Sequence, residues 1–262
     1  MKLPALPLDQ YDRGARLTPA LVTLLPVMIP LVSVYGSKNP VLTGVLGLLI
    51  SCGALVTLAN VAGGRGKATE EKLVKKWGGM PTTIALRHSD SFLDTVTTTR
   101  YHSLIADKLG MPLPTADAER ADPAAADNSY MGATRRLREL TRSDRGLLFK
   151  ANINYGFHRN MLGLRPIGIA TALIGLAYGL ILSGSLTFRP LAFDLITLAA
   201  PGLAGGISTA VSLMLLITWL LYVSEATTRR AGFVYAERLF ELLPKLAGPS
   251  KKRTGSDSKV DG

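Results

Sequence analysis

The stretch LTPALVTLLPVMIPLVSVY (Leu17–Tyr35) opens an apolar block that continues to Ala62. A second apolar block begins with PIGIATALIGLAYGLILS at Pro166 and continues to Val223. Because a helix needs roughly 20 apolar residues to cross a bilayer, each block is too long for one crossing and suits two. The sequence therefore predicts an all-α integral membrane protein, in which four transmembrane helices form two hairpins that flank a mostly helical domain.

Turn-forming residues divide both blocks. The run GSKNP at residues 36–40 breaks the first block, and residues 184–206, with Pro190 and several glycines, break the second. Inside the second break, Leu191–Ala204 is apolar but is interrupted by Pro201, so we expect an interfacial or re-entrant segment there. The four expected spans are Leu17–Tyr35, Val41–Ala62, Pro166–Ser183 and Ile207–Val223.

Basic residues predict the orientation of the spans. Residues 63–163 contain sixteen Lys and Arg, the N-terminal arm contains three and the tail after Val223 contains eight, whereas the two opposite loops have only Lys38 and Arg189. Because cytoplasmic loops keep an excess of Lys and Arg, both termini and the central domain are expected in the cytoplasm. The expected parts are an N-terminal arm (1–16), hairpin 1 (17–62), a cytoplasmic sensor domain (63–163), hairpin 2 (164–223) and a basic tail (224–262).

The predicted spans contain no ionisable side chain apart from tyrosine, since Lys38, Arg189 and Asp194 all fall in turns or at their edges. A proton-coupled carrier normally keeps carboxylates or histidines at membrane depth, so this class is disfavoured. The spans instead carry Gly, Ser and Thr, which favour close helix packing or, alternatively, line a pore. Asn60, one turn from the cytoplasmic end of the second span, is the predicted pore or gate residue.

The chain carries no recognisable catalytic motif. It has no Ser-His-Asp or Cys-His pair and no phosphate-binding GxxxxGK[ST] loop, and its single cysteine, Cys52, excludes an intramolecular disulfide. His88, Asp90, Asp94 and His102 do not have the spacing of an established zinc site. We therefore expect a protein that is not an enzyme and that uses no metal and no cofactor.

The central segment is expected to be mostly helical, because capping residues and glycine stops bracket several apolar stripes. Thr82–Arg87 is expected to be a strand or a connector, and Met111–Asn128, rich in Ala, Asp and Pro, an exposed linker. The predicted helices are Ala68–Trp77 opened by Thr69, a helix from Ser89 or Asp90 to Leu109, Ser129–Thr141, and Ser143–Leu162, which continues into the third span.

Arginines recur at helical spacing near the end of this segment. Arg135, Arg138 and Arg142 lie three and four residues apart, and only Glu139 opposes them. Arginine is the better bidentate phosphate ligand, so a nucleotide or nucleic-acid ligand is one interpretation, and a cationic belt against anionic lipids is the other. The predicted phosphate ligands are Arg135, Arg136, Arg138, Arg142, Arg145, Lys150 and Arg159.

The helix that follows the arginines carries side chains that can stack on bases or bond to their edges. The net charge of +11 also indicates attraction to phosphate or to anionic lipid, without choosing between them. The predicted base-contacting residues are Asn152, Asn154, Tyr155, Phe157 and His158.

Two motifs carry a resemblance to a known family. WGGMPTTIALRHSDSFLDTVTTTRYHSLIADKLG (Trp77–Gly110) and RGLLFKANINYGFHRNMLG (Arg145–Gly163) resemble the cytoplasmic part of the HalB-like membrane effectors of the bacterial Hailong anti-phage system, and the layout of spans is similar. The resemblance implies an oligomeric ion channel that a single-stranded DNA oligomer, made by a partner nucleotidyltransferase, holds closed. Loss of the oligomer during phage infection opens the channel and depolarises the cell. The resemblance assigns no individual ligand residue.

The resulting hypothesis is a homo-oligomeric, nucleotide-oligomer-gated channel in the bacterial inner membrane. One alternative is a membrane effector with the opposite gating, opened by a cyclic nucleotide. The other is a non-conducting membrane scaffold whose basic surface binds anionic lipids. A neighbouring nucleotidyltransferase gene would favour both channel hypotheses over the scaffold.

Overall fold

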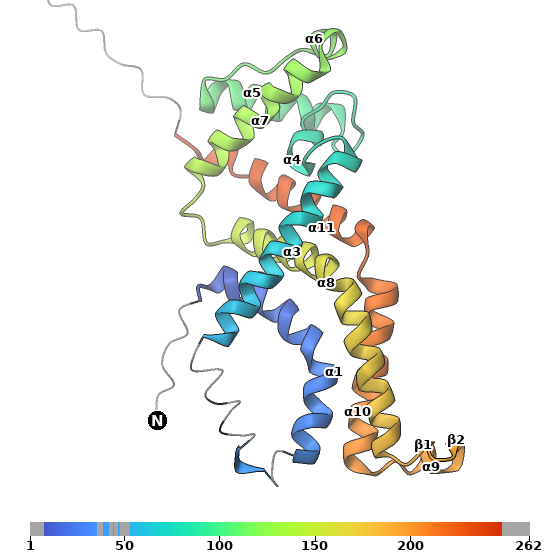
Figure 1. Ribbon diagram of the computed structural model, residues 1–262. Helices are drawn as coiled ribbons and strands as arrows, with labels where there is room; N and C mark the ends of the chain where they lie inside the picture. The colour runs from blue at the N-terminus through green and yellow to red at the C-terminus, as the bar shows by residue number, and fades with distance from the viewer. Residues whose placement is uncertain (1–7, 36–38, 42–43, 45–46, 48–52, 248–262) are drawn as a thin grey trace, which may run out of the picture. The chain divides into compact units, whose positions relative to one another are not determined.

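The computed structural model describes residues 8–35, 39–41, 44, 47 and 53–247 (Figure 1). The protein is mostly helical (78%), as expected. The chain forms two compact units. Unit 1 consists of Met1–Gly78 and Phe149–Gly232, and unit 2 consists of Gly79–Leu148 and Phe233–Gly262.

Unit 1 contains the apolar helices. Among the described residues, three segments are long and apolar enough to cross a membrane: Asp12–Val34, Leu147–Leu182 and Gly202–Tyr222. The first, third and fourth predicted spans are thereby confirmed as long apolar helices. The elements of this unit are η1 (Asp12–Leu17), α1 (Thr18–Tyr35), α3 (Ala54–Trp77), α8 (Leu147–Leu182), β1 (Leu186–Phe188), β2 (Leu191–Phe193), α9 (Leu195–Ala199), α10 (Gly202–Ile217) and η2 (Thr218–Tyr222).

The second predicted span, Val41–Ala62, lies in large part outside the described residues. Its last part belongs to α3, which runs without a break to Trp77. The prediction of a separate helix that starts at Ala68 was therefore wrong. The glycines between the two expected helices do not stop α3, and one of them serves a close contact: a side chain at Gly66 would overlap Asn160 of α8.

Helix α8 confirms that the predicted helix ending at Leu162 continues directly into the third span. It begins at Leu147 rather than at Ser143 and passes through Pro166 without ending. In the core of this unit, Trp219 is completely buried, and Gly168 lies so close to its indole ring that any side chain there would overlap.

The segment between α8 and α10 is a small antiparallel strand pair followed by a short helix. Strands β1 and β2 pair Leu186 with Phe193, and Asp194 caps α9 by accepting a hydrogen bond from the Ile196 amide (2.8 Å). Helix α10 begins at Gly202, earlier than the expected start at Ile207. The glycines expected to interrupt this span instead lie within it, and Gly205 lies close to the backbone of Ser183, which directly follows α8.

Unit 2 is a group of short helices around a core that contains both apolar and hydrogen-bonded polar side chains. Its apolar core includes Leu86, Ile105, Leu137, Leu239 and Phe240, all at most 1% exposed. Helix α11 contributes through its second half, which begins at the unit boundary. The elements are α4 (Pro81–Ile84), α5 (Thr95–Leu109), α6 (Ala116–Ala121), α7 (Pro123–Leu140), the end of α11 (Glu225–Phe240) and η3 (Leu243–Lys245).

Two local predictions near the start of unit 2 were wrong. The run Thr82–Arg87 begins as helix α4, because Pro81 occupies the first helical turn. Asp94, and not Ser89 or Asp90, caps α5 by accepting from the Thr97 amide (2.8 Å).

The expected linker Met111–Asn128 is also largely helical. Thr115 caps α6, and Asp122 caps α7 with Pro123 in its first turn. The Ala-rich composition that resembles a disordered segment is also a good helix composition once caps are supplied.

Candidate functional site

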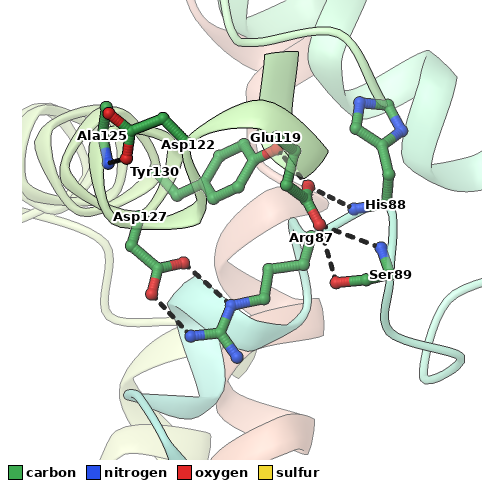
Figure 2. A network of polar contacts seen from close by, with 8 residues as sticks. All are labelled: Arg87, His88, Ser89, Glu119, Asp122, Ala125, Asp127 and Tyr130. Carbon is green, nitrogen blue, oxygen red and sulfur yellow. Dashed lines mark hydrogen bonds and ion pairs between the residues drawn. The ribbon is translucent and has the colours of Figure 1, made fainter. Parts of the chain in front are cut away.

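A buried carboxylate organises the interior of unit 2 (Figure 2). Glu119, from α6, is 5% exposed. Its Oε2 accepts hydrogen bonds from the His88 amide (2.8 Å) and the Tyr130 hydroxyl (2.7 Å). Its Oε1 accepts from the amide (3.1 Å) and the hydroxyl (2.6 Å) of Ser89. Helices α6 and α7 and the segment after α4 are therefore joined at one carboxylate.

These hydrogen bonds determine the charge of the cluster. Burial alone raises the pKa of Glu119, but the hydrogen bonds from Ser89, Tyr130 and the His88 amide outweigh burial and lower this pKa to about 2. Burial, and then the bond to Glu119, raise the pKa of Tyr130. At neutral pH the carboxylate is ionised and the phenol is protonated, as their hydrogen bond requires.

An ion pair between the segment after α4 and α7 adjoins this cluster. Arg87 Nε donates to Asp127 Oδ1 (2.8 Å), and Arg87 Nη2 donates to Asp127 Oδ2 (2.6 Å), as Figure 2 shows. The hydrogen bond to Asp127 raises the pKa of Arg87, although burial opposes it. Two parallel bonds restrict the orientation of α7 more than a single contact does.

The two histidines of unit 2 belong to the same interior. Their rings meet edge to face at 4.6 Å. His88 Nε2 lies 3.1 Å from the Pro114 carbonyl oxygen and His102 Nε2 lies 2.8 Å from that of Leu86, so in each ring we assign the proton to Nε2. Among the described residues, no group of three or more His, Cys, Asp or Glu side chains is placed to hold a metal ion.

Helix α7 carries its arginines outside its buried stripe. Arg135, Arg136 and Arg138 are exposed, and Arg142 is exposed in the turn that follows the helix. Arg136 pairs with Glu139 (3.2 Å). The buried residues of α7 are Ala126, Tyr130, Ala133, Thr134 and Leu137.

Arg135, Arg138 and Arg142, here called the arginine face, make no ion pair with another residue of the described ranges. Charges along unit 2 are unevenly distributed: residues 87–127 carry seven Asp and Glu against four Lys and Arg, whereas residues 135–145 carry five Arg against two acidic residues. Arg145, also a predicted phosphate ligand, is exposed in this basic part. The arginine face is therefore a local concentration of positive charge.

The other predicted ligand residues lie on α8, in unit 1. Lys150 and Asn154 are exposed, and Asn152 is half-buried. Phe157 packs against the core of unit 1. The predicted site is thus divided between the units, and the arginine face is the part that unit 2 carries.

Tyr155 and Arg159 belong to an internal network of unit 1. Arg159 Nη1 pairs with Glu70 Oε2 of α3 (2.9 Å), in side chains that are only 13% and 17% exposed. Tyr155 is 6% exposed, and Glu70 lies near its hydroxyl group. The ring of His158 contacts those of Phe157 and Tyr222. A phosphate could reach Arg159 only by displacing Glu70.

A polar contact that the sequence did not reveal joins three helical elements of unit 1. Asn160 is completely buried, donates through Nδ2 to the Ala15 carbonyl oxygen of η1 (2.6 Å), and lies against Gly66 of α3. The glycine run in α3 was the available signal, because a glycine inside a helix often marks a close approach.

Arg165 was not predicted to have a role either. Its Nε donates to the Trp219 carbonyl oxygen (3.0 Å) and its Nη2 donates to that of Leu220 (3.2 Å). Both acceptors lie in the π-helical turn η2, whose wider geometry leaves carbonyl groups for side chains. Asn60, the predicted gate residue, is exposed on α3.

One partly open pocket of unit 2, of about 420 Å³, adjoins the Glu119 network. Its two cations, Arg87 and Arg120, are paired with Asp127 and Asp117. The arginine face is therefore a better binding surface for an anion than this pocket.

Comparison of the chain with protein-family models, with curated proteins and with solved structures gave no match.

Proposed function

We propose that this protein is a channel whose unit 2 binds a single-stranded DNA or other nucleotide oligomer through the arginine face and thereby gates the membrane spans. The observation that carries the proposal is the arginine face itself. Arg135 and Arg138 lie one turn apart on α7, and Arg142 is exposed in the turn that follows, so three guanidinium groups are available to the phosphates of an oligomer. Tyr130 and Asp127 of α7 bond to Glu119 and Arg87, so Arg135 and Arg138 project from a rigid support.

The proposal includes four spans in two hairpins, with unit 2 and both termini in the cytoplasm of a bacterial cell. The asymmetry of basic residues and the three long apolar helices support this arrangement. The resemblance to HalB-like effectors supports a homo-oligomer that the ligand holds closed, a partner nucleotidyltransferase as the source of the ligand, and opening during phage infection.

Binding of a fluorescent single-stranded oligonucleotide to the full-length protein in detergent tests the proposal. Affinity should fall steeply as salt rises, because phosphate contacts release counterions. Replacing Arg135, Arg138 and Arg142 together with Gln should weaken binding by roughly 1 to 3 kcal/mol for each arginine that bonds to a phosphate.

The matched control is Arg100→Gln, which removes an exposed arginine of α5 outside the arginine face. It should leave binding almost unchanged. Equal binding by the triple variant and the unchanged protein would contradict the proposal. Loss of binding to anionic vesicles, with no loss of oligonucleotide binding, would assign the arginine face to lipid.

The direction of gating has its own test. A ligand shifts a closed-to-open equilibrium only through its difference in affinity for the two states. If the oligomer prefers the closed state, Arg138→Gln should depolarise uninfected cells, as measured with a voltage-sensitive dye. A channel opened by its ligand predicts no depolarisation by this variant.

A further inference from the structure

Three buried hydroxyl groups of α10 have no hydrogen-bond partner among the described residues. They belong to Ser208, Thr209 and Ser212, and both serines are completely buried. Thr218, further along the same span, donates to the Met214 carbonyl oxygen (2.9 Å), as hydroxyls in helices usually do. The three unbonded hydroxyls therefore point away from the acceptors that their own helix offers.

These hydroxyls face glycines of α8. A methyl group at Gly175 would lie 2.6 Å from Ser212 Oγ, and one at Gly179 would lie 2.6 Å from Thr209 Oγ1. Ser208 is one turn before Ser212 on the same side of α10. Because an unbonded buried hydroxyl is destabilising, three at one helix contact indicate a ligand that the described residues do not supply.

Helix α1 adds a carbonyl oxygen at the same place. Pro26 is buried, and its carbonyl oxygen contacts the position of the missing Gly175 side chain, as Ser212 Oγ does. The residue four positions later, Pro30, has no amide hydrogen, so the helical bond that the Pro26 carbonyl would accept cannot form. Helices α1 and α10 thus bring two oxygen atoms with unused lone pairs, the Pro26 carbonyl oxygen and Ser212 Oγ, to Gly175 of α8, and Thr209 Oγ1 lies one turn away at Gly179.

The chemistry of this set favours a hard monovalent cation. Hydroxyl and carbonyl oxygens are ligands of hard cations, whereas calcium sites in proteins draw on carboxylates. Helices α1 and α10 contain no charged residue. A pocket of about 260 Å³ between α1 and α8, lined in part by Val27, Pro30 and Tyr178, also includes Gly175, which Ser212 Oγ and the Pro26 carbonyl oxygen approach.

We propose that Ser212 Oγ and the Pro26 carbonyl oxygen, at Gly175, form the centre of a binding site for a partly dehydrated alkali-metal cation in unit 1, with the unbonded hydroxyls of Ser208 and Thr209 along the same helix contact. The ligands are neutral, so binding is weak and reversible, which suits an ion in transit. The inference goes beyond the proposed function, because it concerns unit 1 alone and requires neither an oligonucleotide nor the arginine face.

Equilibrium binding of radioactive sodium and rubidium to the full-length protein in detergent tests this site. Choline chloride replaces the alkali salt to keep the ionic strength constant. The unchanged protein should bind at least one of the two cations saturably. Ser212→Ala should weaken this binding roughly tenfold, as expected when a charged group is deprived of one ligand. Thr218→Ala, which removes a hydroxyl already bonded to Met214, is the matched control and should bind normally.

Thermal unfolding supplies a second measurement, in which the sign of the difference in melting temperature between Ser212→Ala and the unchanged protein should depend on the salt. In choline chloride, Ser212→Ala should melt at the same temperature as the unchanged protein or higher, since it removes an unbonded hydroxyl. In the salt of the bound cation, the unchanged protein should melt higher. Ser212→Cys keeps the side-chain volume and replaces oxygen with sulfur, so it should also lose binding even where the smaller alanine disturbs the helix contact.

The absence of saturable binding by both cations would overturn the inference, and the hydroxyls would then bond to trapped water. Undiminished binding by both Ser212→Ala and Ser212→Cys would overturn it as well. The oligonucleotide assay uses a different ligand and different variants, so failure of either proposal is distinguishable from failure of the other.

Discussion

The Glu119 network of unit 2 and the contact between α8 and α10 in unit 1 differ in how their buried polar groups are bonded. In unit 2, Glu119 accepts four hydrogen bonds and Arg87 pairs with Asp127 through two. In unit 1, the hydroxyls of Ser208 and Ser212 are equally buried but unbonded within the described residues. A network whose partners all come from the chain maintains the fold, whereas unused bonding capacity indicates an external partner. Burial of a polar residue is therefore weaker evidence of function than the lack of a hydrogen-bond partner for its buried donors and acceptors.

Removing the Glu119 carboxylate is expected to have the largest effect. Glu119→Ala leaves the Ser89 and His88 amides and the Tyr130 hydroxyl without their acceptor, and should destabilise unit 2 by about 3 kcal/mol or more. Thermal unfolding combined with limited proteolysis of the full-length protein measures this destabilisation. Glu139→Gln, at an exposed carboxylate of α7, should change stability by less than about 0.5 kcal/mol. Similar destabilisation in the two variants would show that the network does not hold unit 2 together.

Acid should remove most of the stability that the Glu119 carboxylate contributes to unit 2. The pKa of Glu119 is about 2 in the folded protein, below its ordinary value of 4.5. A carboxylate with a lowered folded pKa stabilises the fold above its unfolded pKa and loses this effect as pH falls through the folded value. Unit 2 should therefore lose up to roughly 3 kcal/mol as pH falls from about 4.5 to about 2. Melting temperatures should fall more steeply for the unchanged protein than for Glu119→Gln, and parallel curves would exclude Glu119 as the cause.

In unit 1, closing the space between α8 and α10 tests whether the helix contact depends on glycine. Gly179→Ala places a methyl group 2.6 Å from Thr209 Oγ1, and should cost about 2 kcal/mol through overpacking. The control is Gly64→Ala in α3, where a methyl group meets nothing within 4 Å. That variant should gain about 0.5 to 1 kcal/mol from helix propensity. Thermal unfolding in detergent compares the two, and a stabilised Gly179→Ala variant would contradict the close contact.

The smallest effect is expected from the arginine pairs of unit 2. Arg87→Lys keeps the charge but replaces two parallel bonds to Asp127 with one, and should cost about 1 kcal/mol. Arg120→Lys alters an ion pair whose side chains are 75% and 88% exposed, and should leave the melting temperature unchanged. An equal response of the two variants would mean that the Arg87 pair contributes no more than a surface pair.

Much of the local structure could be predicted from residues that are neighbours in the chain. The apolar runs predicted three of the long helices, and Gly78 and Gly110 end α3 and α5 with positive φ, as expected of glycine stops. Helix starts were less predictable, because several residues near Asp94 can cap a helix and only one is used. The start of α3 was mispredicted because its glycines lie within the helix, where Gly66 makes room for Asn160 of α8.

The candidate site could be predicted only in part. Exposure of Arg135 and Arg138 follows from the amphipathic pattern of α7, since its apolar and small residues form the buried stripe. The same kind of pattern did not show that Arg159 and Tyr155 are engaged with Glu70. That partner lies far away in the sequence, and nothing in the local sequence around α8 points to it.

The sequence by itself determined the helical character, the apolar spans and the basic run of α7, because each depends on composition and spacing within about twenty residues. Only the tertiary structure decided which polar groups find partners. Glu119 accepts a hydrogen bond from Tyr130, and Asn160 bonds to the Ala15 carbonyl oxygen and packs against Gly66. The Ser212 hydroxyl has no hydrogen-bond partner among the described residues. Hydrogen bonding depends on distances of a few tenths of an ångström between separate helices, and no local pattern specifies them.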